Sequence, residues 1–412
     1  MCKKVDERLP QNIGKGVLPD YPAVKSPWGK LVGYQEAMHY VSRYNAVISA
    51  SLMQVLRILM PDYATRAATM CAEAYGRLRY IQQMYGEANM DEHNIHPFCR
   101  GNFVGALTGD SGDEALMMCG RCTDFGTYRV EKELDVCDWD IVGSELCRAT
   151  TQSLEASCDS WADKLRKGPK LEYHMVEAKG CGDLHCRIVA ESREKYPMPP
   201  HAQWECMGPV ATADQIKFTT EDYLVKESMV FREECDYTFS NGTNMERDAS
   251  SVATMLAQSS AALTYILPCM DMMVKQGMVE EKTLDHVIRC VCEAAGKAAF
   301  GECYAREGLR TWLGAPHDVD DGRLLGGHIE MYLQGFRVPY EIEAFNKDEV
   351  IYVIDTMPLS LYNSYPKHVD ALKWTWYGMA RTLINTQWFC WEEDSPAGKL
   401  RIKIAKKIDK FC

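Results

Sequence analysis

The sequence predicts an α+β fold made of two similar lobes, each a helical hairpin packed on a small, mainly antiparallel sheet. Three observations carry this prediction. Amphipathic helical patterns occur in two pairs, short alternating patterns typical of strands follow each pair, and short stretches of the two halves match at a nearly constant separation. With 412 residues, the chain is long enough for two or three domains of ordinary size.

Each predicted helical hairpin consists of two long helices separated by a break, at Pro61 in the first pair and at Gly277 in the second. In the second helix of each pair, Glu73-Ala-Tyr-Gly-Arg77 matches Glu293-Ala-Ala-Gly-Lys297 at an offset of 220. The helices are expected at residues 33–59, 63–85, 250–275 and 281–307.

The predicted strands also repeat. An alternating stretch precedes each of two matching segments, Gly182–Ile188 and Gly398–Ile404, which are offset by 216. Duplication over about 200 residues predicts two similar domains packed as a pseudo-dimer; a single irregular α+β domain is the alternative.

The Gly- and Asp-rich stretch 99–127 is interpreted as a loop. Strands are expected at 128–136, 171–177 and 387–392, and a further helix at 141–165.

These patterns divide the chain into four parts. The Pro-rich stretch between the two copies is interpreted as a connector. The first copy is expected to be active and the second degenerate. The boundaries are an N-terminal extension at 1–32, a first lobe at 33–190, a connector at 191–247 and a second lobe at 248–412.

Composition narrows the class of protein. A formal net charge of -12 repels phosphate backbones and anionic lipid surfaces, so neither nucleic acid nor a membrane is expected as a partner. No apolar segment resembles a signal peptide or a membrane span, and the 18 cysteines are therefore expected to be reduced, in a cytoplasmic protein. A homo-oligomer, or a partner subunit, is compatible with the sequence.

The most informative segment is Cys181-Gly-Asp-Leu-His-Cys186, which holds two thiols, a carboxylate and an imidazole at a turn leading into a strand. A thiol nucleophile needs a base or cation nearby and a group that orients it. Two geometries stay open: Cys186 with a partner from elsewhere, or Cys181 with His185. In the second copy, the positions of Asp183, His185 and Cys186 become Lys399, Arg401 and Ile402. The alternative is a core cysteine beside a turn-capping Asp183.

Two further clusters of polar residues carry a weaker functional signal. Asp140, Glu145 and Cys147 lie where a strand end meets a helix start, and helix capping explains them as well as function does. The pairs His93 and His96, and Cys119 and Cys122, have spacings that zinc or another divalent metal tolerates, although the gap between them fits no standard finger. The sequence identifies no definite cofactor. The sequence contains no Gly-rich phosphate loop.

The segment from Tyr173 to Val189, with its Gly-Asp pair followed by a Cys and a basic residue, resembles the closing signature of the L-2-amino-thiazoline-4-carboxylic acid hydrolase family. The helix that carries Cys147 resembles the cysteine-bearing helix of that family. The resemblance covers the first half of the chain. It implies hydrolytic opening of a small heterocycle or cleavage of a related non-peptide C–N bond. Cys186 would be the thiol, Asp183 the carboxylate and Cys147 a thiol facing the pocket.

The expected activity is therefore cysteine-centred hydrolysis of a small-molecule substrate. Catalysis is expected from Cys186, Asp183, His185, Cys181 and Cys147, and substrate contacts from Glu145, Asp140 and Arg187. Backbone N–H groups near Gly182 are expected to hold the developing negative charge. The alternative is a small-molecule-binding or metal-binding sensor without catalysis. A pocket with convergent titratable groups favours the enzyme, and an apolar cavity favours the sensor.

Overall fold

A computed structural model of the chain describes helices together with small antiparallel sheets, which confirms the α+β class. None of the helices in the described part of the chain has the length and apolar character needed to cross a bilayer. The structure describes residues 23–89, 120–125, 129–134, 137, 139–152, 171–192, 261–303, 306–335, 338–356, 367–384, 387–394 and 398–406.

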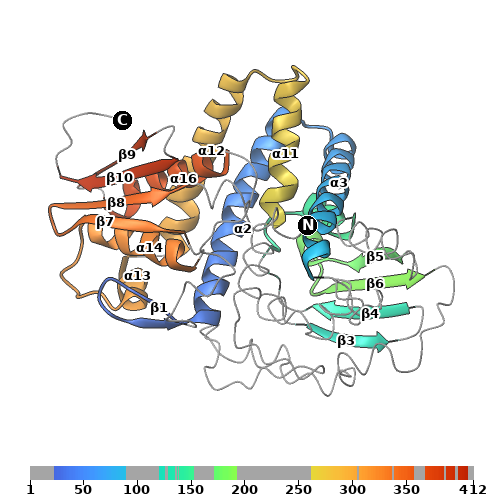
Figure 1. Cartoon of the computed structure of the whole chain (residues 1–412), viewed down its shortest axis with the longest axis horizontal. Coiled ribbons are helices and arrows are strands. Elements are labelled where there is room, and N and C mark those ends of the chain that lie inside the picture. Colours follow the sequence, from blue (N-terminus) through green and yellow to red (C-terminus); the bar gives the residue numbers. More distant parts are fainter. Residues whose placement is uncertain are drawn as a thin grey trace. The chain divides into compact units, whose positions relative to one another are not determined.

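Contacts divide these residues into two units, each drawn in Figure 1: an N-terminal unit of residues 62–192 and a C-terminal unit of residues 23–61 and 261–406. The sequence-based division placed the helix α2 (Tyr34–Leu59) in the first lobe. The contacts place α2 in the C-terminal unit, because it packs mainly against three helices of that unit. Those three helices are α11 (Ala261–Lys275), α12 (Glu281–Cys303) and α14 (Gly322–Gly335).

The N-terminal unit combines helices with a four-stranded antiparallel sheet in the order β3-β4-β6-β5 (Figure 1). The short 3-10 helix η2 (Lys179–Cys181) lies between β5 and β6 in the sequence. The prediction of a loop at 99–127 is wrong in part, since β3 lies within that range. Gly and Asp disfavour a strand there, but the backbone hydrogen bonds to β4 stabilise one. The elements are α3 (Tyr63–Asn89), a helix at 144–152, β3 (Gly120–Phe125), β4 (Arg129–Leu134), β5 (Leu171–Glu177) and β6 (Cys186–Ser192).

The C-terminal unit contains a second four-stranded antiparallel sheet, in the order β7-β8-β10-β9. Alternate residues of its central strands are buried, such as Tyr352 and Ile402, and α14 and α16 contact this sheet (Figure 1). The further elements are β1 (Ala23–Lys25), β2 (Leu31–Gly33), α13 (Arg306–Leu313), β7 (Tyr340–Phe345), β8 (Glu349–Asp355), α16 (Lys367–Leu383), β9 (Trp388–Asp394) and β10 (Lys399–Ala405).

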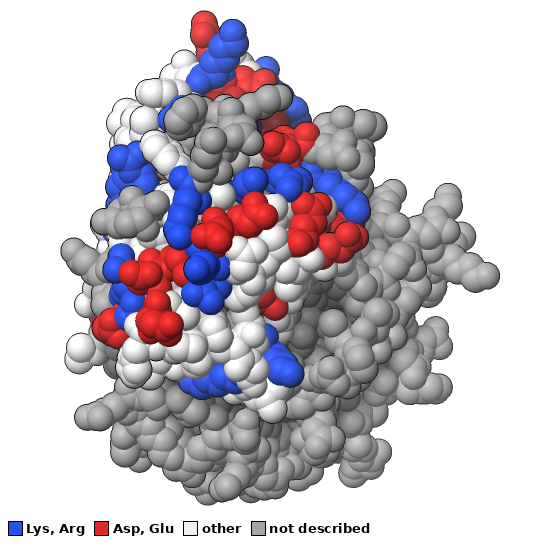
Figure 2. Space-filling model, turned by 90° about the vertical axis from the view of Figure 1, so that its left-hand side faces the viewer, with Lys and Arg blue, Asp and Glu red and all other residues white. Residues whose placement is uncertain are grey.

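Charged side chains of both signs cover this unit. Arg401 Nη2 lies 2.9 Å from Glu343 Oε2, and Lys403 Nζ lies 3.3 Å from Glu349 Oε2. On the side shown in Figure 2, acidic and basic side chains are interleaved over the described surface. The described part of this face therefore offers no patch of one sign to a charged polymer.

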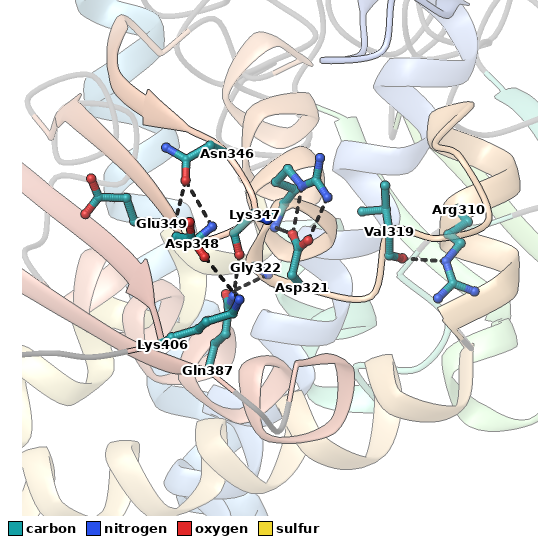
Figure 3. Close-up of polar contacts among 11 residues, drawn as sticks. Arg310, Val319, Asp321, Gly322, Asn346, Lys347, Asp348, Glu349, Gln387 and Lys406 are labelled. Carbon is teal, nitrogen blue, oxygen red and sulfur yellow. Dashed lines mark hydrogen bonds and ion pairs between the residues drawn. The ribbon is translucent and has the colours of Figure 1, made fainter.

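The start of α14 is fixed by side chains from distant loops (Figure 3). The Gln387 Oε1 atom accepts a hydrogen bond of 2.7 Å from the Gly322 N–H, and the Gln387 amide donates to the Lys347 carbonyl at 3.0 Å. Asp321 accepts from the backbone N–H of Arg323 at 3.0 Å. These bonds satisfy N–H groups that the first turn of a helix leaves without partners.

Glycine allows α12 and α16 to approach closely. A Cβ atom on Gly296 of α12 would overlap the Thr375 carbonyl oxygen, and one on Gly378 of α16 would overlap the Glu293 carbonyl oxygen. Both neighbours are backbone atoms, which cannot rotate away as a side chain would. The contact of these two helices therefore depends on glycine at both positions.

We expect Gly296→Ala to destabilise the protein by about 1–3 kcal/mol, because the added methyl group forces the helices apart. Gly308→Ala is the matched control, since the described structure leaves open space around that position in α13. It should be neutral or stabilise by about 0.5–1 kcal/mol. Thermal unfolding followed by circular dichroism measures both, and an unchanged melting temperature for Gly296→Ala would contradict the packing argument.

Candidate thiol site

The thiol loop, residues 178–185, joins β5 to β6 and is closed by Asp183. Its Oδ2 atom accepts a hydrogen bond of 2.8 Å from the Ala178 N–H. The Ala178 carbonyl in turn accepts from the N–H groups of Cys181 at 2.8 Å and Asp183 at 3.2 Å. Gly182 has a φ of 101°, a left-handed conformation that favours glycine. Asp183 thus holds the shape of the loop, and β6 begins only at Cys186.

Cys186 is the best candidate nucleophile among these residues. Its side chain is buried, and its Sγ accepts a hydrogen bond of 3.3 Å from the Lys179 N–H. A hydrogen bond with Cys137, this N–H, and the nearby charges of Lys179 and His185 lower the pKa of Cys186 to about 7 against the opposing effect of burial. A substantial fraction of this thiol is therefore ionised at neutral pH.

His185 is oriented by Glu177, a residue that the sequence reasoning did not select. The His185 Nε2 atom lies 2.7 Å from Glu177 Oε2, and the Arg187 Nε atom lies 3.6 Å from the same oxygen. Glu177 reaches this position because the register of β5 shifts between Met175 and Glu177, which places Glu177 opposite Arg187. Its place as the last residue of an alternating strand beside the turn is the signal that could have identified it.

Two more cysteines lie beside Cys186, and the pKa of each is raised. Burial, followed by the neighbouring thiols, raises the pKa of Cys147 to about 12. Burial and the charge of Asp183 also raise the pKa of Cys181, although its side chain is exposed. A Cβ atom on Gly180 would lie 2.7 Å from the Cys147 Sγ, so the thiol loop packs directly on the helix 144–152.

The two acidic candidates for substrate binding, Glu145 and Asp140, lie in the helix 144–152 and in the turn before it. Glu145 is 2% exposed, and its Oε1 atom accepts hydrogen bonds from Arg66 Nε at 3.1 Å and Nη2 at 2.9 Å. This pair joins α3 to the helix 144–152. Asp140 is half-buried in the preceding turn, where its N–H donates to the Cys137 carbonyl at 3.4 Å. The turn thereby places Cys137 near Cys186.

The residues expected to bind zinc fall mostly outside the description. His93, His96 and Cys119 lie outside the described residues, and Cys122 lies in β3 without a described side chain. Among the described residues, no three His, Cys, Asp or Glu side chains are grouped so that they could hold a metal ion.

Comparisons of the chain with protein-family models, with curated proteins and with solved structures find no match.

We expect Glu145→Ala to destabilise the N-terminal unit by about 3–5 kcal/mol, because it leaves the Arg66 guanidinium buried without its carboxylate. The double variant Arg66→Met with Glu145→Leu should recover most of this loss, since it removes both charges. Chemical denaturation of the single and double variants measures the difference. Equal losses in the two proteins would show that the ion pair is not the cause.

We expect alkylation of Cys186 by iodoacetamide to rise with a midpoint near pH 7, because the thiolate is the reactive form. Cys147 should stay unmodified across the same range, since burial raises its pKa to about 12. Mass spectrometry of digested protein, labelled between pH 5 and pH 9, measures each site. A Cys186 midpoint near that of an ordinary thiol would remove it as the activated cysteine.

Proposed function

We propose that the N-terminal unit is a hydrolase that opens a small heterocycle, or cleaves a related non-peptide C–N bond, with Cys186 as nucleophile. The observation that supports this most strongly is the environment of Cys186, whose pKa is lowered to about 7 beside a His–carboxylate pair. A nucleophile, a proton carrier and a group that orients the carrier are the parts such chemistry needs. Here Glu177 is the orienting carboxylate, and Asp183 is a positioning residue.

The proposed reaction runs in two steps. The Cys186 thiolate bonds to the electrophilic carbon, the C–N bond breaks, and the nitrogen receives a proton from the His185 imidazolium. Water then attacks the same carbon, gives a proton to His185 and releases the Cys186 thiolate. The net reaction adds one water across the C–N bond.

The source of stabilisation for negative charge differs from the sequence-based expectation. The Gly182 N–H already donates to the Lys179 carbonyl at 3.0 Å, so it does not face a substrate. The N–H of Gly180 is directed to the Cys147 thiol, and that of Lys179 to Cys186. The Lys179 ammonium, which donates to the Leu184 carbonyl at 3.1 Å, is the cation on the loop that a substrate could recruit.

The proposal includes the duplication, with the N-terminal sheet as the active copy. The two sheets share one strand order, first-second-fourth-third, and each has a register shift in its first hairpin. The shifts lie between Cys122 and Asp124 and between Ile342 and Ala344, 220 positions apart. That offset equals the one between the matching helix stretches.

Strand register gives a better alignment of the two copies than the sequence did. Cys186 pairs with Leu134 on β4. The residue 220 positions after Leu134 is Ile354 on β8, and it pairs with Leu400. Leu400 therefore takes the place of Cys186, where the sequence match had placed Ile402. The ion pair of Glu177 and Arg187 corresponds to that of Glu392 and Arg401 at 3.7 Å. The second sheet thus keeps the cross-strand ion pair and lacks the thiol, which supports a structural role for Arg187.

We expect Cys186→Ala to abolish turnover and Cys181→Ala to leave at least half of it, because the pKa of Cys186 is lowered whereas that of Cys181 is raised. The probe is L-2-amino-thiazoline-4-carboxylic acid, the substrate that the family resemblance suggests, with ring opening followed by chromatography. His185→Gln should lower kcat by about 10²–10⁴-fold. Binding without turnover by the unmodified protein would favour the sensor alternative, and activity unchanged in Cys186→Ala would refute the nucleophile.

A further inference from the structure

A buried carboxylate in the C-terminal unit belongs to none of the chemistry above. Glu330 of α14 is 6% exposed. Its Oε2 atom accepts a hydrogen bond from the Tyr352 hydroxyl at 2.8 Å, and its Oε1 atom accepts from the Tyr340 hydroxyl at 3.0 Å and from the Gln334 amide at 3.3 Å. All three donors are neutral. Within the described residues, no Lys, Arg or His charge acts on this carboxylate.

A pocket of about 360 Å³ opens beside Glu330. This volume is within the range of small-molecule sites. One part of the wall is polar, from Glu330, Gln334 and Ser26, and the other part is apolar, from Pro27, Ile342 and Phe345. A polar end and an apolar wall suit a small molecule with a polar head and an apolar body.

A β-bulge builds the apolar wall. Ile342 lies opposite Tyr352 and Phe345 lies opposite Val350, with the register shift between them at Glu343. In a regular strand, residues three apart point to opposite faces, so without the bulge only one of the two could face α14. Both Phe345 and Tyr352 contact α14, because their Cε2 atoms lie 3.4 and 3.3 Å from the position of a Cβ on Gly326.

Lys25 also lines the pocket, and its backbone bonds Gln334. Its N–H donates to the Gln334 Oε1 atom at 2.9 Å, and its carbonyl accepts from the Gln334 amide at 2.8 Å. The Lys25 Cε atom lies 3.7 Å from the position of a Cβ on Gly29, so the side chain lies over the turn at Gly29. Gln334 is thereby held in place beside Glu330 by the edge strand β1.

We propose that this pocket binds a small organic cation, with Glu330 as the counter-ion for its ammonium or amidinium group and with its apolar body against Pro27, Ile342 and Phe345. A buried carboxylate held only by neutral donors lacks the opposite charge that would offset its lost hydration. Two carboxylate oxygens can accept about four hydrogen bonds, and the described residues supply three, so an N–H of the ligand finds an acceptor.

The charge balance of the site agrees with a cationic ligand. Burial raises the pKa of Glu330, although its hydrogen bonds to Tyr352, Tyr340 and Gln334 act in the opposite direction. The surroundings thus disfavour the negative charge in the absence of a ligand. A bound cation favours it, and a bound anion would be repelled.

The test measures binding of benzylamine, benzamidine and n-butylamine to the full chain by isothermal titration calorimetry, with benzyl alcohol and benzoate as neutral and anionic analogues. We expect benzylamine to bind about tenfold or more tightly than benzyl alcohol, and Glu330→Gln to remove this preference, because a charge-assisted hydrogen bond is lost. Glu343→Gln, at an exposed acidic position on β7, the strand that carries Ile342, is the control and should bind benzylamine as the unmodified chain does.

A second variant keeps the test decisive if Glu330→Gln fails to fold. Ile342 is 48% exposed at the pocket, so Ile342→Trp should fold normally and weaken all three cations by filling the space. The proposal is overturned if none of the cations binds at millimolar concentration, if benzyl alcohol equals benzylamine, or if both variants bind as before. Because Cys186 is not part of this pocket, the Cys186→Ala variant should bind benzylamine normally.

Discussion

The hydrogen bond between the Asp183 carboxylate and the Ala178 N–H is the constraint on which the thiol site depends. It closes a tight loop, which Gly182 permits through its left-handed conformation. The closed loop presents the Lys179 N–H to Cys186 and the Gly180 N–H to Cys147. A single carboxylate thus positions the backbone donors of two thiols.

The two thiols that receive these donors have opposite pKa shifts, which shows which interaction decides the outcome. Each accepts one backbone N–H, and Cys186 is buried whereas Cys147 is half-buried. Cys147 is otherwise surrounded by thiols, so burial dominates and raises its pKa to about 12. Cys186 also has the Cys137 hydrogen bond and the charges of Lys179 and His185, which together outweigh burial. Environments that separate the pKa values of similar groups are typical of acid–base and nucleophilic sites.

The sequence predicted local features well and non-local ones poorly. The ends of α2 at Leu59 and α11 at Lys275, and the whole of β5, follow from periodicity and turn residues, which act over a few positions. β3 was missed because its stability comes from pairing with β4. The segment around Cys186 was found from residue density alone, but the role of Glu177 depends on a bulge and a cross-strand pair that no local pattern reveals.

A shared strand order does not place chemistry at the same position in the two sheets. In the N-terminal unit the reactive groups lie on the hairpin between β5 and β6, where the thiol loop adds residues that the β9–β10 connection lacks. In the C-terminal unit the buried carboxylate comes from α14, and the bulge in β7 shapes its surroundings. On the proposed duplication, loop length and a covering helix determine where each copy carries function, while the strand order is left unchanged.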